Sequence, residues 1–117
     1  MPKKKGGSKG KSIAVVVILA IVIVGVLAWH DGAIGVTSMA DINSGNVDIG
    51  TVVTVKGELI IRLGNQLTIQ DENLNFVAFT WDGTIPPLNS IIVVTGRVTS
   101  FVTLGDVTSV RQAIIFR

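Results

Sequence analysis

The sequence predicts an all-β domain, a small five-stranded barrel, preceded by a single N-terminal transmembrane α-helix. Two observations carry this prediction. Residues 13–29 form an unbroken apolar block of 17 residues, which is typical of a helix that spans a lipid bilayer. From Thr51 onward, apolar and polar residues alternate in five short runs separated by turn-forming residues, as expected of strands with one buried face.

The composition divides the chain into four segments. Residues 1–12 form a basic tip, 13–29 the predicted transmembrane helix, 30–46 a tether rich in small residues, and 47–117 the β domain. Within the tether, residues 39–42 are expected to make one helical turn. The alternative for the apolar block is a cleaved secretory signal, because Ser38 and Ala40 supply small residues before Asp41. The block is longer than the apolar core of such signals, about 7 to 15 residues, which favours a retained signal anchor.

The distribution of basic residues predicts the orientation of the helix. Five of the ten basic residues are lysines within the first eleven positions, and the 20 residues after the apolar block contain no lysine or arginine. The positive-inside rule therefore predicts a cytoplasmic N-terminus and an extracytoplasmic β domain. Lys11 and Trp29 are expected to anchor the two ends of the helix at the membrane surfaces. The tip is expected to be disordered and to contact anionic lipid headgroups.

The five strands are predicted from the runs of alternating apolar and polar residues and from the turn-forming residues between these runs. The first begins at Thr51 and ends before the turn at residues 63–65. The others are predicted at residues 66–70, 76–81, 91–101 and 107–116, and the prolines at 86 and 87 place residues 82–87 in a loop. In the first strand, the side chains expected on the core face are Val53, Val55, Gly57, Leu59 and Ile61. Gly57 and Gly96 are expected to mark bends or bulges that help the sheet to close.

Three segments, VTVKGEL (53–59), LTIQD (67–71) and VTGRV (94–98), resemble the OB-fold. Within that superfamily, the N-terminal anchor and the minimal barrel are similar to the membrane-anchored haem chaperones of cytochrome c maturation. The aromatic strand with Phe79 and Trp81, followed by Gly83 and Pro86, is similar to the corresponding segment of that family. The resemblance implies a role in cytochrome c biogenesis with haem as a candidate cofactor. That family attaches haem through a histidine or cysteine beyond the barrel, near a tyrosine. This chain has neither cysteine nor tyrosine, and its one histidine is His30, so no haem-attaching residue is carried over.

Charge and residue types exclude several classes of function. From Asp41 onward the chain has five basic and seven acidic residues, a net charge of −2, which argues against nucleic acid as a partner because phosphates require clustered lysine and arginine. With one histidine and no cysteine, the chain is not expected to combine a catalytic nucleophile with a general base. A metal site is not expected either. His30 and Asp31 are interpreted as polar residues at the helix end. The carboxylates of Asp71, Glu72 and Asp82 are interpreted as turn residues. We therefore expect no enzyme activity.

The candidate binding surface consists of aromatic and basic side chains. Phe76 and Phe101 fall out of phase with the core faces of their strands, so they are expected either to form a stacking surface or to plug an open end of the barrel. Arg62, Arg97 and Arg111 are expected to be solvated strand residues or to ring a small anionic patch.

These observations favour a membrane-tethered OB-fold binding module, with the lipid bilayer and a protein of the membrane or exported compartment as partners. A divergent relative of the haem chaperones is a finer version of this hypothesis. Two alternatives remain: an envelope or filament subunit that assembles through its hydrophobic helix, and a single-stranded nucleic-acid-binding OB domain.

Overall fold

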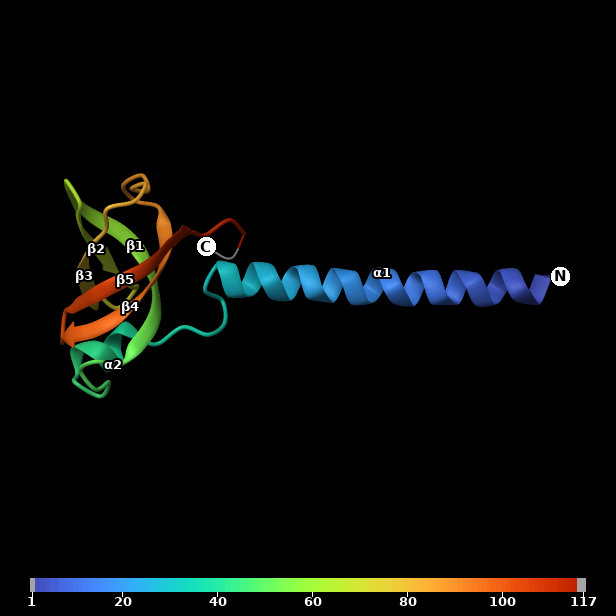
Figure 1. Ribbon diagram of the computed structural model, residues 1–117, viewed down its shortest axis with the longest axis horizontal. Coiled ribbons are helices and arrows are strands. Elements are labelled where there is room, and N and C mark those ends of the chain that lie inside the picture. Colours follow the sequence, from blue (N-terminus) through green and yellow to red (C-terminus); the bar gives the residue numbers. More distant parts are fainter. Residues whose placement is uncertain (1, 116–117) are drawn as a thin grey trace.

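The computed structural model describes residues 2–115, with side chains from residue 12 onward. A long helix, α1 (Pro2–His30), projects from a β-barrel, and a short helix, α2 (Met39–Asn43), precedes the first strand (Figure 1). The strands are β1 (Val52–Leu63), β2 (Gln66–Gln70), β3 (Phe76–Thr80), β4 (Ile91–Ser100) and β5 (Thr103–Gln112).

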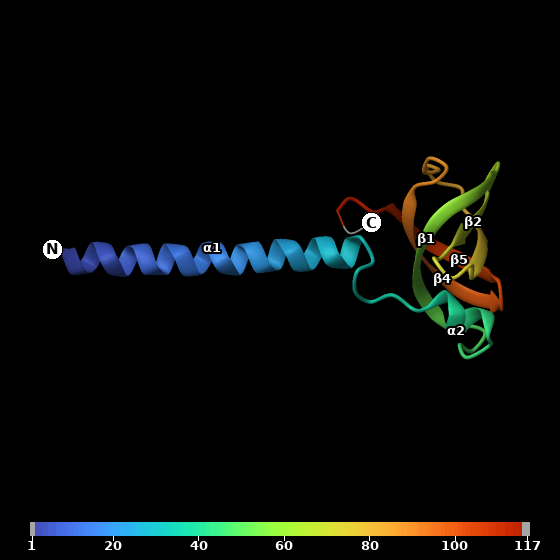
Figure 2. The same cartoon turned by 180° about the vertical axis from the view of Figure 1, so that it is seen from behind.

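The five strands close into a barrel in the order β1-β2-β3-β5-β4, seen from two sides in Figures 1 and 2. Neighbouring strands are antiparallel except β3 and β5, which run parallel where Ala78 lies opposite Thr103. Strand β1 closes the barrel because it is long enough to pair with β4 along its first half and with β2 along its second half. The predicted fold class, a five-stranded barrel behind one apolar helix, is confirmed.

The core follows the predicted alternation in most strands. Burial of these side chains removes apolar surface from water, which is the main favourable term in folding. The buried strand residues of the core are Val53, Val55, Leu59, Leu67, Ile69, Val77, Phe79, Ile92, Val94, Val98 and Leu104. Strand β2 has the predicted bounds. Strand β5 begins at Thr103, four residues before its predicted start, because it pairs with β4 on both sides of an irregularity: Gly105 lies opposite Arg97 and Ser109 opposite Thr95. Phe116, which the prediction included, lies outside the described residues.

The two glycines expected at bends have different roles. Gly96 lies where the β4–β5 register shifts, as predicted. Gly57 does not mark a bulge, because its pairing with Ile92 continues the β1–β4 register without a break. It is required by close packing instead: a Cβ at this position would lie 2.6 Å from Met39 Cε and 2.8 Å from the carbonyl oxygen of Gln70.

Part of the expected tether belongs to the barrel. The predicted helical turn is present as α2, and the side chain of Ser38 caps its N-terminus by accepting from Ala40 N at 3.2 Å. Met39 and Ile42 are only 2% and 1% exposed and form part of the core cluster. Cleavage before Asp41 would therefore remove Met39 from the core, which favours retention of the N-terminal segment.

Helix α1 is longer than the predicted transmembrane segment. The stretch Ser12–His30 is long and apolar enough to cross a membrane, and none of it is buried against the barrel. The helix also includes the basic tip from Pro2 onward, which was expected to be disordered. Lys11, the predicted anchor at the first end, lies in the helix, and its side chain is outside the described part of the structure.

Candidate ligand-binding groove

A bulge in β1 turns two apolar side chains to the outer face of the barrel. The β1–β2 register shifts between Leu59 and Ile61. A shift of one residue moves the following side chains to the opposite face of a strand. Ile61, which the alternation assigned to the core, is therefore 45% exposed, and Leu63 is 68% exposed. The prediction for Ile61 was wrong because alternation along one strand does not reveal a bulge.

These two side chains line a groove of about 440 Å³ on the outer face of the sheet. This volume is within the range of small-ligand sites, about 300–1,000 Å³. The groove is lined by apolar and neutral polar residues: Ile61, Leu63, Gln66, Leu67, Thr68, Ala78, Phe79, Thr80, Thr103 and Leu104. It thus crosses β1, β2, β3 and the start of β5.

Phe76 and Phe101 lie together toward the α2 end of the same face, tied by one side chain. Nδ2 of Asn43 donates to the carbonyl oxygens of Phe76 at 2.9 Å and Phe101 at 2.6 Å, while Phe76 N donates to Asn43 Oδ1 at 3.1 Å. The two phenylalanines are 43% and 61% exposed, so both are available for contact. Met39 and Ile42 of α2 belong to the buried core cluster, and Phe76 and Phe101 do not.

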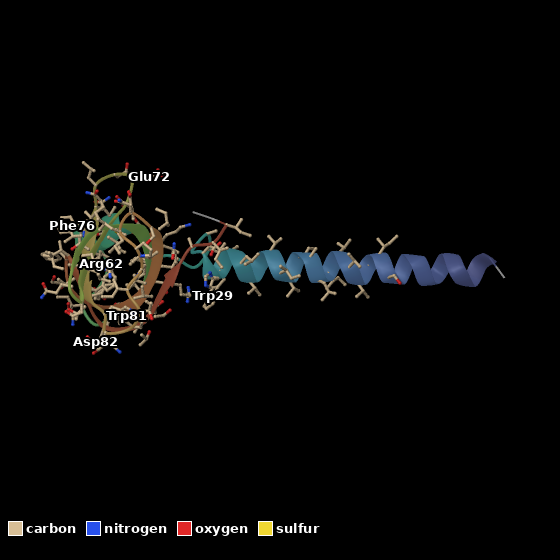
Figure 3. All side chains as sticks on the ribbon, turned by 90° about the horizontal axis from the view of Figure 1, so that it is seen from above. Trp29, Arg62, Glu72, Phe76, Trp81 and Asp82 are labelled. Atoms are coloured by element: carbon tan, nitrogen blue, oxygen red, sulfur yellow. The ribbon has the colours of Figure 1, made fainter. Side chains whose placement is uncertain are left out.

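The three arginines of the candidate surface do not form one patch. Arg97 donates to the carbonyl oxygen of Gly50 at 2.6 Å, and its Nε lies 3.6 Å from Asp106 Oδ2 in an exposed pair. Arg62 lies in β1 between the two apolar residues that line the groove and is exposed. Arg111 belongs to β5 and lies beside the end of α1, with its Cζ 4.3 Å from the centroid of the Trp29 ring. Figure 3 shows Arg62 and Phe76 on the barrel and Trp29 at its junction with the helix.

Of the three turn carboxylates, Asp71 makes the local hydrogen bonds that its interpretation as a turn residue requires, whereas Asp82 bonds to the β1–β2 turn, 17 residues away in the sequence. Asp71 accepts from the backbone N–H groups of Asn73 and Asn75, each at 2.9 Å, and from Asn75 Nδ2 at 3.0 Å. Asp82 accepts from Asn65 Nδ2 at 2.9 Å. Within residues 2–115, no group of three or more histidine and carboxylate side chains is arranged to hold a metal ion.

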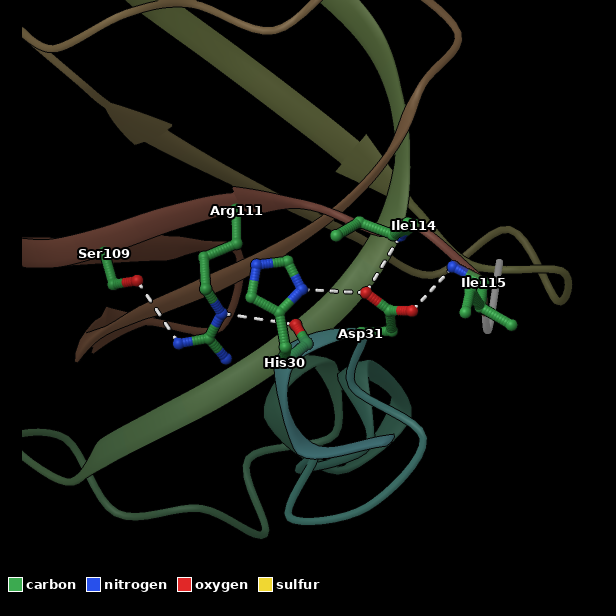
Figure 4. Close-up of polar contacts among 6 residues, drawn as sticks. All are labelled: His30, Asp31, Ser109, Arg111, Ile114 and Ile115. Carbon is green, nitrogen blue, oxygen red and sulfur yellow. Dashed lines mark hydrogen bonds and ion pairs between the residues drawn. The ribbon is translucent and has the colours of Figure 1, made fainter. Parts of the chain in front are cut away.

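The end of α1 is attached to the barrel by a buried carboxylate (Figure 4). Asp31 is fully buried. Its Oδ1 contacts His30 Nδ1 and accepts from Ile114 N, both at 2.8 Å, and its Oδ2 accepts from Ile115 N at 2.7 Å. Arg111 Nε donates to the carbonyl oxygen of His30 at 3.2 Å. The interpretation of residues 30 and 31 as a simple polar helix end missed this junction, because the partners lie more than 80 residues away in the sequence.

No family model and no curated protein matches this sequence. Three similar solved structures are the telomere capping protein Ten1 from S. pombe, the S. pombe Stn1–Ten1 complex, and replication protein A from U. maydis bound to ssDNA. Ten1 has a TM-score of 0.60 and 14% identity over 71% of this chain and 84% of its own. The Stn1–Ten1 complex has a TM-score of 0.58 and 16% identity over 69% of this chain and 77% of its own. Replication protein A has a TM-score of 0.55 and 18% identity over 70% of this chain and 74% of its own.

At these identities the likeness shows the fold alone. The barrel has the OB fold, as the three sequence segments predicted. The narrower resemblance to haem chaperones stays a prediction.

Proposed function

We propose that this chain is a non-enzymatic, membrane-anchored binding module whose groove on β1, β2 and β3 holds a segment of a partner protein. OB folds bind oligonucleotides and oligosaccharides on the face of their second and third strands, and the groove occupies this face. The observation that carries the proposal is the group of exposed apolar side chains, Ile61, Leu63, Phe76 and Phe101, on or beside the groove. Exposed apolar patches on a soluble domain mark surfaces that contact other molecules.

The lining of the groove favours protein over nucleic acid. Its apolar and neutral polar side chains supply contacts for a peptide but no counter-charge for phosphates, which contribute most of the affinity for nucleic acid. The net charge of −2 from Asp41 onward acts in the same direction. The Stn1–Ten1 complex shows a similar fold in a protein complex, whereas the ssDNA complex of replication protein A makes single-stranded DNA the alternative ligand to exclude.

The segment that resembles the haem chaperones also has a packing explanation. Trp81 packs against the core, and its indole N–H donates to the carbonyl oxygen of Thr84 at 3.2 Å. A Cβ at Gly83 would lie 2.7 Å from the Trp81 ring. The aromatic residue and the glycine therefore fit together in this loop without a ligand, so the motif alone does not favour haem binding.

The proposed location is the membrane, with α1 as a single-pass anchor. Support comes from the apolar stretch Ser12–His30 and from the lysines that precede it, which by the positive-inside rule keep the N-terminus in the cytoplasm and the barrel outside.

Charged substitutions in the groove are expected to weaken partner binding. A photo-crosslinking amino acid at Thr68 of the full chain, expressed in its native membranes, should give a discrete protein adduct. The double variant Ile61→Asp/Leu63→Asp should reduce that adduct at least about tenfold, equivalent to about 1.4 kcal/mol, because both carboxylates would have to be desolvated against an apolar partner. The matched control is Ile49→Asp, since Ile49 is 70% exposed but does not line the groove.

Equal loss of the adduct in the control, or no loss in the double variant, would contradict the assignment of the groove. Fluorescence anisotropy with labelled single-stranded DNA at physiological salt, and a titration with haemin followed by absorbance, test the two other ligand classes. Saturable binding of either that the groove variant abolishes would replace the protein partner as the ligand.

A further inference from the structure

The junction between α1 and the barrel carries four exposed apolar side chains from three separate segments. They are Trp29 at 55%, Ile34 at 55%, Ile114 at 54% and Ile115 at 62% exposure. We call these four residues the junction collar. Figures 1 and 2 show that the loop after α1 and the segment after β5 both lie beside the last turn of α1. The collar is therefore continuous with the end of the apolar helix.

The length of the helix sets the level of the collar relative to a membrane. The apolar stretch Ser12–His30 has 19 residues. At about 1.5 Å per residue it covers about 28 Å, close to the hydrocarbon thickness of about 30 Å. Because the collar includes Trp29 and lies beside the last turn of this stretch, it lies at the boundary between hydrocarbon and headgroups. Tryptophan is enriched at this level in membrane proteins.

The backbone of the collar is prepared for an environment poor in water. Irregular segments are costly near hydrocarbon when their N–H groups lack partners. The N–H groups of Ile114 and Ile115 both donate to the Asp31 carboxylate, at 2.8 and 2.7 Å. Asp31 is fully buried, so it satisfies the backbone from within the junction.

Arg111 completes the junction on the side of the headgroups. Its Nε donates to the last carbonyl group of α1, at His30, and its guanidinium covers the Trp29 ring. Arginine side chains at this level combine an apolar stem with a charged end that favours anionic lipid headgroups. A cation next to helix C-terminal carbonyl groups is also favourable.

From this geometry we infer that the junction collar inserts into the interfacial layer of the bilayer and seats the barrel on the membrane surface. The occupant of the collar is lipid, because the collar continues the apolar surface of the membrane helix. The inference rests on the proposed membrane anchoring. Seated in this way, the barrel holds its β1–β2 hairpin away from the membrane, since the hairpin lies at the side opposite α1 in Figures 1 and 2.

Single fluorescent labels on the full chain in phosphatidylcholine–phosphatidylglycerol vesicles test the seating. The chain has no cysteine, so each introduced cysteine carries the only label. A label at Ile115→Cys should be quenched by nitroxide lipids and be about threefold less accessible to aqueous iodide than a label at Leu63→Cys, as expected of a side chain at the acyl boundary. The two positions are matched, since Ile115 and Leu63 are 62% and 68% exposed in the protein alone.

A third label separates the inference from the anchoring on which it rests. A label at Val22→Cys should be quenched by deep nitroxide lipids; failure there would overturn the anchoring itself. Quenching at Val22 together with equal iodide access at Ile115 and Leu63 would overturn only the seating.

Asp31→Asn tests the role of the buried carboxylate. The amide nitrogen cannot accept from a backbone N–H, so one of the two bonds is lost and the segment after β5 is released. The label at Ile115 should become as accessible to iodide as the label at Leu63, while the label at Val22 stays protected. Asp48→Asn, at an exposed position, should change neither, and unchanged protection of Ile115 in Asp31→Asn would contradict the role given to the carboxylate.

Discussion

Replacement of Ile42 by alanine is expected to lower the free energy of unfolding of the barrel by about 2–5 kcal/mol. Ile42 is 1% exposed and packs in the core cluster from α2, outside the five strands. Its truncation would leave a cavity that the neighbouring strands cannot fill without strain. Urea unfolding of the full chain in detergent micelles would measure the effect through Trp81 fluorescence. A Trp29→Phe background makes Trp81 the only tryptophan, since the chain has two.

Ile49→Ala is the matched control, because the same side chain is 70% exposed there. A substitution at such a surface position is expected to change stability by less than about 0.5 kcal/mol. Equal and small effects of the two variants would mean that α2 is not part of the core, and that residues 30–46 act as the flexible tether that their composition suggests.

The strands and the long apolar helix were predictable because their signals repeat along the sequence. Alternation over five or more residues predicted the bounds of β2, the first residues of β3 and β4, and the core face of the first half of β1. An apolar block gave the helix. Each of these signals is local, so no knowledge of partners elsewhere in the chain was needed.

The features that position the groove and the junction were not predictable for the same reason. The helical turn of α2 was predicted, but its packing into the core was not, because Met39 and Ile42 alone do not indicate a buried face. The bulge that turns Ile61 outward depends on pairing with β2, and its own strand alternates normally up to that point. Asp31 resembles any polar residue at a helix end until β5 brings the backbone of Ile114 to it.

The candidate surface combines local and long-range features of the chain. Phe76 and Phe101, singled out because they fall out of phase with the predicted core faces, are both exposed, Phe76 in β3 and Phe101 in the β4–β5 turn. Their proximity depends on Asn43, which lies 33 and 58 residues away in the sequence. The three arginines were grouped by residue type alone. This grouping did not predict that Arg111 donates a hydrogen bond to the end of α1.

Replacement of Asn43 by alanine is expected to destabilise the barrel by about 1.5–4.5 kcal/mol, because three hydrogen bonds are lost and each contributes about 0.5–1.5 kcal/mol. Its amide links β3 to the β4–β5 turn through the carbonyl groups of Phe76 and Phe101. The loss should also accelerate hydrogen exchange at the N–H of Ala78, which donates to the carbonyl oxygen of Val102 in that turn at 2.7 Å.

Asn43→Asp separates the two donated bonds from the accepted one. A carboxylate still accepts from Phe76 N but cannot donate to either carbonyl group, and it places a charge beside their oxygens. We therefore expect Asn43→Asp to destabilise the barrel at least as much as the alanine variant, with the same faster exchange at Ala78. Asn46→Ala, at an exposed position in the same segment, is the control and should leave both measurements unchanged. Wild-type exchange at Ala78 in both Asn43 variants would show that the β4–β5 turn is held on β3 without this amide, and the aromatic end of the groove would then need another support.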